Sequence, residues 1–278
     1  MSGPGNVVSL AAHRALAASQ ARLATSFSRL SSGVRIDAAS DDPAGLAVSD
    51  LMRAQIGSFT QAARNASDGI SLLQTAQGGL AAVGDNLARM AELATQAANG
   101  LLSDPQRQAI QNEFDALRGE IDRTAASTSF NGRPLLDGSL AMSGLSVQVG
   151  TDAAPTSSID VTIAGVSSST LGGATPLSAA SLGTATDARA ALDAINAAAA
   201  SVAQDLSGIG AGMARLQATG QSIAVSIENL TAASSRIRDT DVAQASADFL
   251  KDQILQKAGI AVLAQANQNN RILLKLLG

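Results

Sequence analysis

Few side chains in this sequence could support catalysis or metal binding. Histidine occurs once, at His13, which leaves little possibility of a Ser–His–Asp site. Cysteine is absent, which excludes Cys–His nucleophilic sites, disulfides and thiolate metal sites. His13 falls in a predicted helix, where a surface or packing role is the simpler interpretation. The inventory supports neither an enzyme nor a catalytic, cofactor-binding or metal site, and we expect no cofactor.

Two short motifs have both a chemical and a structural interpretation. The acidic pair Asp41–Asp42 could hold a metal ion, but it directly precedes Pro43, and a helix cap explains it more simply. The glycines of "GIGAG" (208–212) could form a phosphate loop, yet no strand precedes them and no lysine follows. Close helix approach or local flexibility is the favoured interpretation of these glycines.

Composition excludes several classes of partner. The chain has 278 residues, 46% of them hydrophobic and 15% charged, with a net charge of −4 and no basic block, so no nucleic-acid partner is expected. Trp and Tyr are absent and Phe occurs five times, which argues against aromatic-lined ligand pockets. No stretch of 18 apolar residues occurs, and "MSGPGNVVSLAAHRALAASQ" lacks a continuous apolar segment. We therefore expect neither membrane insertion nor a cleavable signal peptide.

The elements that dominate the sequence are helices with heptad repeats. A first stripe of apolar residues with spacings of three and four consists of Leu73, Ala76, Leu80, Val83, Leu87, Met90, Ala94 and Ala97. A second stripe consists of Ala188, Leu192, Ile195, Ala199, Val202, Leu206, Ile209, Met213, Leu216, Gly220, Ile223, Ile227, Leu230, Ser234 and Ile237. Such sustained a/d repeats predict coiled-coil packing, and the many alanines favour close helix bundles.

Helix boundaries follow from capping signals. A helix of about 6–33 is separated by a break at 34–42 from one of about 43–100, which begins with Asp42 as N-cap and Pro43 at the first helical position. A third helix begins after "SDPQ", with Asp104 as N-cap, and ends before the "FNG" turn at 130–132. The two halves of the chain must pair, because each apolar stripe is one-sided and too apolar to stand alone.

The middle of the chain has the sequence pattern of strands and loops rather than of helices. The segments "LSVQVG" (145–150) and "SIDVTI" (158–163) alternate apolar and polar residues and predict a β-hairpin. Residues 164–184 are rich in Ser, Gly, Thr and Ala and are expected to form a loop. The fold class is therefore mainly α, with long antiparallel helices and one small β-hairpin.

Several long motifs resemble bacterial flagellins. "RLSSGVRIDAASDDPAGLAVSD" (29–50), "ARNASDGISLLQTAQGGL" (63–80) and "EIDRTAASTSFNGRPLL" (120–136) are similar to the amino-terminal region of that family. "SRIRDTDVAQASADFLKDQILQKAGIAVLAQANQ" (235–268) resembles the matching carboxy-terminal region. The resemblance covers about 1–163 and 185–278, and scarce aromatics without Cys or Trp are usual in flagellins.

This resemblance implies a domain layout. In flagellins the chain ends pair as an inner coiled coil lining the filament lumen, and a spoke joins it to an outer helical bundle with a β-hairpin. The inner coiled coil would comprise 1–33 and 240–278, and the spoke 34–42 and 234–239. The outer bundle would comprise 43–163 and 185–233, with 164–184 as a short variable loop. Many relatives insert surface domains there, so we expect a minimal subunit without them.

Particular residues follow from the same resemblance. We expect the inner coiled-coil assembly to use Leu16, Leu23, Phe27, Leu30, Phe249, Ile254, Leu255, Val262 and Leu276. On the helix 43–100, Arg89, Leu93 and Gln96 lie off the apolar stripe, and an exposed leucine would suggest a contact. "LARMAELATQAAN" resembles the flagellin segment that packs between subunits along a protofilament and that the vertebrate Toll-like receptor recognises; Glu113 in "QNEF" matches a further position of that surface. The simpler alternative is an exposed helical face with a stray leucine.

The function implied is structural, namely self-assembly into the flagellar filament for swimming. The resemblance implies secretion through the flagellar secretion apparatus, a flagellar export chaperone at the carboxy-terminal helix, and contacts with filament cap and hook-junction proteins. It also implies terminal helices that fold and become buried on polymerisation, and a Toll-like innate receptor as partner of depolymerised monomers only. The alternatives are a hook–filament junction protein, against which "DDPAGLAVSD" and "QILQKAGIAVLAQANQ" argue, a signalling coiled coil, and an enzyme built on a helical bundle.

Overall fold

The computed structural model describes the backbone of residues 4–277 and the side chains of residues 10–142, 144–265 and 268. The chain divides into two compact units. The terminal unit comprises residues 1–54 and 229–278, and the central unit comprises residues 55–228. Two long helices, α2 (Pro43–Ala97) and α5 (Ala185–Arg238), contribute to both units.

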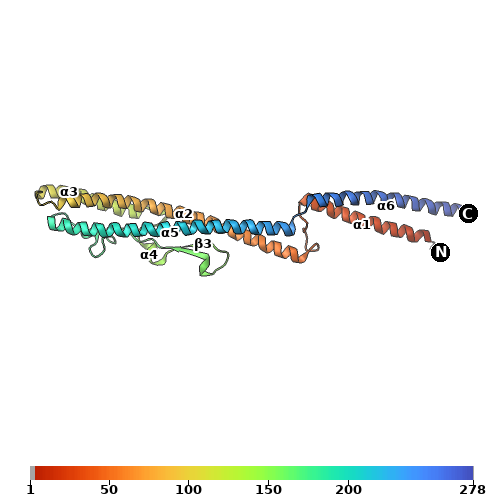
Figure 1. The fold of residues 1–278 in the computed structure, drawn as a ribbon, viewed down its shortest axis with the longest axis horizontal. Coiled ribbons are helices and arrows are strands. Elements are labelled where there is room, and N and C mark those ends of the chain that lie inside the picture. Colours follow the sequence, from red (N-terminus) through yellow and green to blue (C-terminus); the bar gives the residue numbers. More distant parts are fainter. Residues whose placement is uncertain (1–3, 278) are drawn as a thin grey trace. The chain divides into compact units, whose positions relative to one another are not determined.

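The terminal unit is built on two antiparallel helices, α1 (Pro4–Ser32) and α6 (Val242–Leu277), which lie side by side (Figure 1). Side-chain contacts follow this direction, since Ser19 meets Asp252 while the earlier Leu16 lies against the later Gly259. Glycine and the small residues of both helices let the backbones approach closely. The predicted pairing of the two chain ends is therefore confirmed.

The break between α1 and α2 is built from a helix cap at each side. Gly33 adopts a left-handed conformation (φ 73°) and its N–H donates to the carbonyl of Arg29 at 2.9 Å, which closes α1. Before α2, Oδ1 of Asp42 accepts the N–H of Gly45 at 3.0 Å, so Asp42 is the N-cap predicted from the sequence. Between these caps the chain forms an isolated β-bridge, in which Val34 pairs with Asp239 of the returning chain.

Three helices form the central unit: the greater part of α2, α3 (Asp104–Ser127) and most of α5, running alongside one another (Figure 1). Every residue of the first apolar stripe is buried in their common core. The second stripe is buried or half-buried throughout, except at Ala199, where the neighbouring Ala198 faces the core instead. Gly212 is buried against Leu73 and Val161, so this glycine of "GIGAG" serves close packing rather than a phosphate loop.

Two predicted helix ends differ from the structure by a few residues. The N-cap of α3 is Ser103, not Asp104, because the side-chain oxygen of Gln106 accepts the backbone N–H of Ser103 in a capping box. Helix α5 continues to Arg238 through the segment predicted as a spoke. No helix breaker occurs before Asp239, and Ile237 continues the apolar repeat, so the helix has no reason to end at 233.

The predicted β-hairpin is confirmed. β3 (Leu145–Gln148) pairs antiparallel with β4 (Ser158–Val161), with Val147 opposite Ile159, and a 3₁₀ turn at Pro155–Ser157 lies between them. A smaller hairpin joins β1 (Ser129–Phe130) to β2 (Arg133–Pro134) through Asn131 and Gly132, both left-handed, as a tight two-residue turn requires. A short helix, α4 (Ser139–Ser143), precedes β3 and was not predicted.

Residues 164–184 are irregular, as predicted, apart from a 3₁₀ turn at Leu177–Ala179. They nevertheless belong to the core, because Leu171, Leu177 and Leu182 are buried there. Helix α3 holds the segment in place, since Asp122 accepts both the N–H and the hydroxyl of Ser168, at 2.7 and 2.8 Å. The short variable loop is thus a fixed strap over the bundle.

Candidate assembly surfaces

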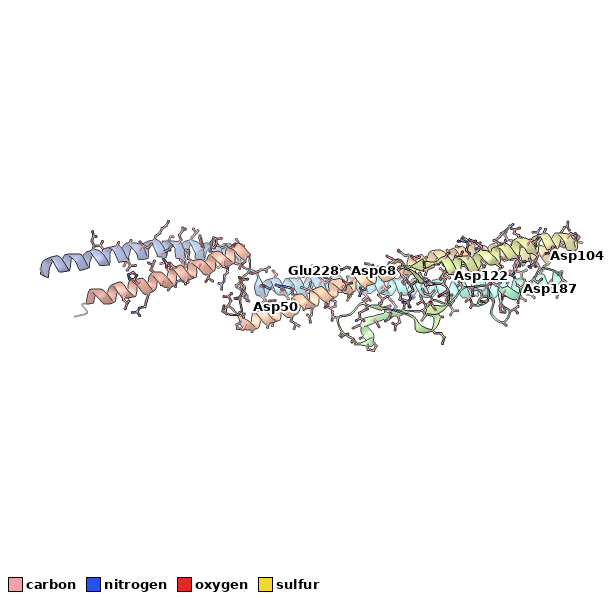
Figure 2. The ribbon with its side chains drawn as sticks, turned by 180° about the vertical axis from the view of Figure 1, so that it is seen from behind. Asp50, Asp68, Asp104, Asp122, Asp187 and Glu228 are labelled. Atoms are coloured by element: carbon pink, nitrogen blue, oxygen red, sulfur yellow. The ribbon has the colours of Figure 1, made fainter. Side chains whose placement is uncertain are left out.

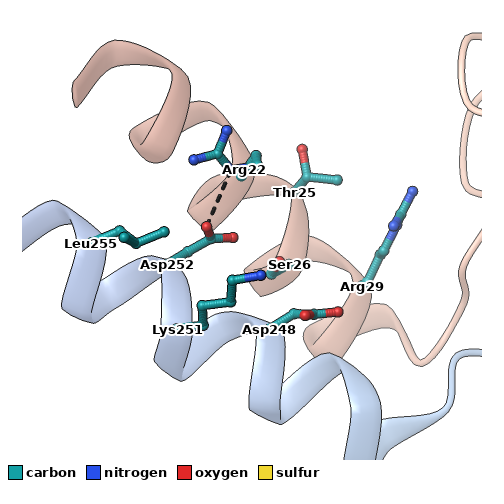
Figure 3. A pocket seen from close by; sticks show the side chains of 8 residues that line it. All are labelled: Arg22, Thr25, Ser26, Arg29, Asp248, Lys251, Asp252 and Leu255. Atoms are coloured by element: carbon teal, nitrogen blue, oxygen red, sulfur yellow. Dashed lines mark hydrogen bonds and ion pairs between the residues drawn. The ribbon is translucent and has the colours of Figure 1, made fainter. Parts of the chain in front are cut away.

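The contact between α1 and α6 is partly polar. Asp252 on α6 is 6% exposed, and its Oδ1 accepts Nε–H of Arg22 on α1 at 3.2 Å (Figure 3). The hydroxyl of Ser19 on α1 donates to the carbonyl of the same residue at 3.3 Å. A buried carboxylate is tolerated only with such partners, so this pair fixes the alignment of the two helices.

Beside this pair lies a groove of about 440 Å³ between the two helices (Figure 3). Its lining carries both signs of charge: Arg22, Arg29, Asp248, Lys251 and Asp252. Within the described part of the chain, Nε of Arg29 is buried without a hydrogen-bond partner. The groove therefore offers charged side chains of both signs for contact with another polypeptide.

The apolar residues predicted for the inner coiled coil fall into two groups. Leu16, Leu23, Leu30 and Phe249 are half-buried where the helices meet. The remaining described ones are exposed: Phe27 (62%), Ile254 (65%), Leu255 (44%) and Val262 (56%). Of these, Leu255 lines the groove between α1 and α6. The side chain of Leu276 lies outside the described residues. The structure therefore does not bury the second group between α1 and α6 of one chain.

The contact stripe of α6 was not predicted from the sequence, apart from Phe249. It runs through Phe249, Asp252, Gln256, Gly259 and Leu263, all of which are buried or half-buried. Four other described residues of α6 are also half-buried: Ala245, Ser246, Asp248 and Gln253. The spacing of three, four, three and four within the stripe is a heptad repeat, which would have been the signal for it. Polar residues at two of the five positions concealed the repeat.

A second candidate surface lies on the central unit, where Arg89 of α2 is the centre of an ion-pair network. Its Nε and Nη2 donate to Oε1 of Glu113 on α3, at 2.9 and 2.7 Å, and its Nη1 donates to Glu92 at 2.8 Å. The hydrogen bonds that Arg89 donates to Glu113 and, to a lesser extent, to Glu92 raise the pKa of Arg89 above its usual value. All three side chains are about half exposed or more, and Gln96 on the same helix is also exposed.

Leu93 does not belong to this surface, and the expectation that it is exposed was wrong. Its side chain is 2% exposed and lies in the core of the central unit. Helix α2 packs against two neighbouring helices, so its buried face is wider than a strict two-position heptad stripe and includes adjacent pairs such as Leu93 and Ala94. The same widening buries Leu72 beside Leu73.

Two negative findings concern the described residues only. They contain no cluster of three or more His, Cys, Asp or Glu side chains arranged to hold a metal ion. None of their helices combines the length and the apolar character that a membrane crossing requires.

The fold also resembles a solved structure. A putative flagellar hook-associated protein from Vibrio parahaemolyticus aligns with a TM-score of 0.59, covering 72% of this chain and all of that one. The sequence identity of 16% means that this likeness shows the fold alone.

Sequence comparison is more specific. Residues 5–141 match the bacterial flagellin N-terminal helical region, and residues 192–277 match the bacterial flagellin C-terminal helical region. The flagellin of Halalkalibacterium halodurans is 39% identical over 98% of both chains. A flagellar filament 30.7 kDa core protein of Treponema maltophilum is 37% identical, again over 98% of both. With both regions present at the expected ends of the sequence, this chain belongs to the bacterial flagellin family.

Proposed function

We propose that this chain is a structural subunit whose copies polymerise into the bacterial flagellar filament. One observation carries the proposal: the terminal unit lacks a core of its own. Among its described side chains, only two apolar residues are buried, Ile36 and Leu263, whereas the central unit has an extended buried core. Two helices that bury so little are marginally stable alone, so they need further helices around them.

Further copies of the chain can supply those helices. The described part of α1 and α6 exposes large apolar side chains on both helices: Leu10, Phe27, Val242, Leu250, Ile254, Leu255, Ile260 and Val262. Burying such side chains contributes about 1.5–3 kcal/mol each, which is the driving force for assembly. Phe27, Ile254 and Val262, which do not meet inside one chain, then contact neighbouring copies. This surface supports coupled folding and burial of α1 and α6 during polymerisation.

The terminal unit forms the inner part of the filament in this proposal, and the central unit forms the outer part. The net charges of the two units differ, as expected if the terminal unit is surrounded by other subunits and the central unit faces solvent. The terminal unit has 11 Lys and Arg against 8 Asp and Glu, a net charge of +3, whereas the central unit has 8 against 15, a net charge of −7. Acidic outer surfaces keep the finished polymer soluble.

Export precedes assembly, and the filament is extracellular. The exposed apolar side chains of α6 must be shielded from solvent before export, so a flagellar export chaperone binds this helix. The flagellar secretion apparatus then exports the chain. The filament cap and hook-junction proteins contact the subunit at the filament ends. The absence of cysteine suits a chain that travels unfolded, since no disulfide has to form or break.

The network around Arg89 serves contacts between subunits along a protofilament. Arg89, Gln96 and Glu113 are exposed on one side of the central unit and available to a partner. In depolymerised monomers the same surface is accessible to a Toll-like innate receptor. Leu93 has no part in either contact, because it is buried.

Seeded growth tests the proposed function. Purified chain is incubated with short filament seeds and followed by electron microscopy, and we expect the seeds to lengthen until the subunit is consumed. Phe27→Asp, in an otherwise unchanged chain, places a charge on the exposed apolar face without touching the central core and should stop growth. Seeds that do not lengthen with the unchanged chain would refute the filament function.

A further inference from the structure

Among the described residues of the central unit, Leu101 is the most exposed large apolar residue after Met142. It lies in the turn between α2 and α3 and is 91% exposed. Its neighbour Leu102 is half-buried against the core, so the chain could have placed a polar residue beside it without loss of packing. A fully exposed leucine at the tip of a bundle contributes nothing to the stability of the monomer.

The turn that carries Leu101 is held rigidly. The guanidinium of Arg107 donates to the carbonyls of Ala97, Asn99 and Leu102, at 3.0, 3.1 and 2.6 Å. The side chain of Asn99 also accepts the N–H of Leu101 at 3.1 Å. Leu101 is therefore presented in a fixed position, which lowers the entropic cost of inserting it into a partner.

A groove that fits such a side chain lies elsewhere on the central unit. It has a volume of about 340 Å³ and runs between α2, the β1 strand and β3. Its walls are mainly apolar, with Leu72, Phe130, Leu145 and Val147, while Asn65 and Asp68 stand at its polar side. Phe130 and Leu145 are only half-buried, so their exposed faces are unpaired within the described chain.

Leu101 cannot reach this groove in its own chain. From Leu72 to Ala97 the α2 helix rises on the order of 40 Å, at 1.5 Å per residue. Figure 2 shows Asp68, which lines the groove, and Asp104, which follows the turn, at different places along the central unit. A knob and a groove separated in this way can be joined only between two copies.

Charges near the two features are complementary. Asp104 is exposed close to Leu101, and Arg133 is exposed on β2, directly opposite Phe130 in the hairpin register. Within the described residues neither side chain has an ion-pair partner. An insertion of Leu101 beside Phe130 would bring the two charges to the same rim.

We propose that Leu101 of one copy inserts into the groove between α2 and the hairpins of a second copy. The proposal rests on the filament function and names a contact surface within it. Each copy has one knob and one groove at different places, so the contact is head-to-tail, does not close and repeats along a row of subunits. The spacing of knob and groove predicts a repeat along that row on the order of 40 Å or somewhat more.

A matched pair of substitutions tests the knob. Leu101→Asp and Met142→Asp each replace a fully or nearly fully exposed apolar residue of the central unit and add the same charge. Both variants should keep the circular dichroism and melting temperature of the unchanged chain. Leu101→Asp should raise the critical concentration for seeded growth at least about tenfold, from the lost burial of one leucine, and Met142→Asp should leave it unchanged. Equal critical concentrations for Leu101→Asp and the unchanged chain would overturn the proposal.

Cysteine cross-linking tests the pairing itself, since the natural chain has no cysteine. Leu101→Cys and Leu145→Cys are combined in one chain, polymerised and oxidised, and the products are separated in denaturing gel without reductant. A ladder of covalent multimers is expected, because a disulfide needs the two Cα atoms within about 7 Å. Each single variant should give no ladder. Filaments of the double variant that yield only monomers would refute the pairing, whereas a failure of the unchanged chain to form filaments would instead refute the proposed function.

Discussion

Arg89 and Glu113 join α2 to α3 through two hydrogen bonds to a single carboxylate oxygen, at 2.9 and 2.7 Å. The pair lies at the surface, with both side chains about half exposed. Exposed ion pairs contribute little to folding, so stability does not explain why the network extends to Glu92 as well. A prearranged, charged surface is better explained by contact with another molecule.

Arg89→Ala should therefore weaken assembly without unfolding the central unit. We expect the melting temperature of the monomer to change little, because exposed ion pairs are screened by solvent, and seeded growth and Toll-like receptor signalling by monomers both to fall. Arg123→Ala is the matched control, because Arg123 is also exposed and ion-paired, with Glu120. Unchanged growth and unchanged signalling in Arg89→Ala would show that this network is only a solvated face.

Leu93→Ala tests the corrected position of this residue. Removing a buried leucine side chain leaves a cavity and should lower the free energy of unfolding of the central unit by about 2–5 kcal/mol, measured by denaturant titration. Leu101→Ala, at an exposed leucine eight positions further along the chain, should change it by less than about 0.5 kcal/mol. Comparable small effects for both would contradict the burial of Leu93.

Asp205 gives a prediction that depends on pH. Burial raises the pKa of its carboxyl above 3.8, although the N–H of Ala164 partly offsets this, and its Oδ2 is buried without a partner among the described residues. A raised pKa in the folded state means that the ionised group lowers stability as pH rises above its unfolded pKa. Asp205→Asn should thus stabilise the central unit at neutral pH, with no gain below about pH 3.8.

Thermal unfolding of Asp205→Asn across this pH range measures the effect. Asp193→Asn provides the control, since Asp193 is an exposed residue of the same helix and loses the same charge. A gain that is equal in the two variants, or that does not diminish on acidification, would contradict the role assigned to burial of Asp205.

Deletion of residues 259–278 tests the role of α6. The deletion removes Leu263, one of the two buried apolar residues among the described side chains of the terminal unit, and the part of α6 that lies against Leu16. The central unit keeps its core, so the truncated chain should remain soluble, helical and cooperative in melting, yet fail to lengthen seeds. Filament growth at the rate of the full chain would show that assembly does not need this helix.

The sequence predicted most of the elements because their signals are local. The apolar stripe from Leu73 to Ala97, the Asp42 cap and the hairpin of 145–150 with 158–163 depend on periodicity and neighbouring residues, and each is present in the structure. The extent of α5 was less predictable. Helix ends depend on weak capping differences, and a segment such as 234–238 has no residue that prevents a further turn.

What the sequence alone determined is the helical class, the pairing of the two chain ends and the resemblance that leads to the family. Tertiary structure decided which face of each helix is covered. Leu93 is buried because α2 has two neighbours rather than one, and Ile254 is exposed because α6 meets α1 through the stripe of Asp252 and Leu263. A heptad pattern indicates that a helix has an apolar face. The number and direction of its neighbouring helices determine how wide the buried face is, and which apolar side chains stay exposed and available to other copies.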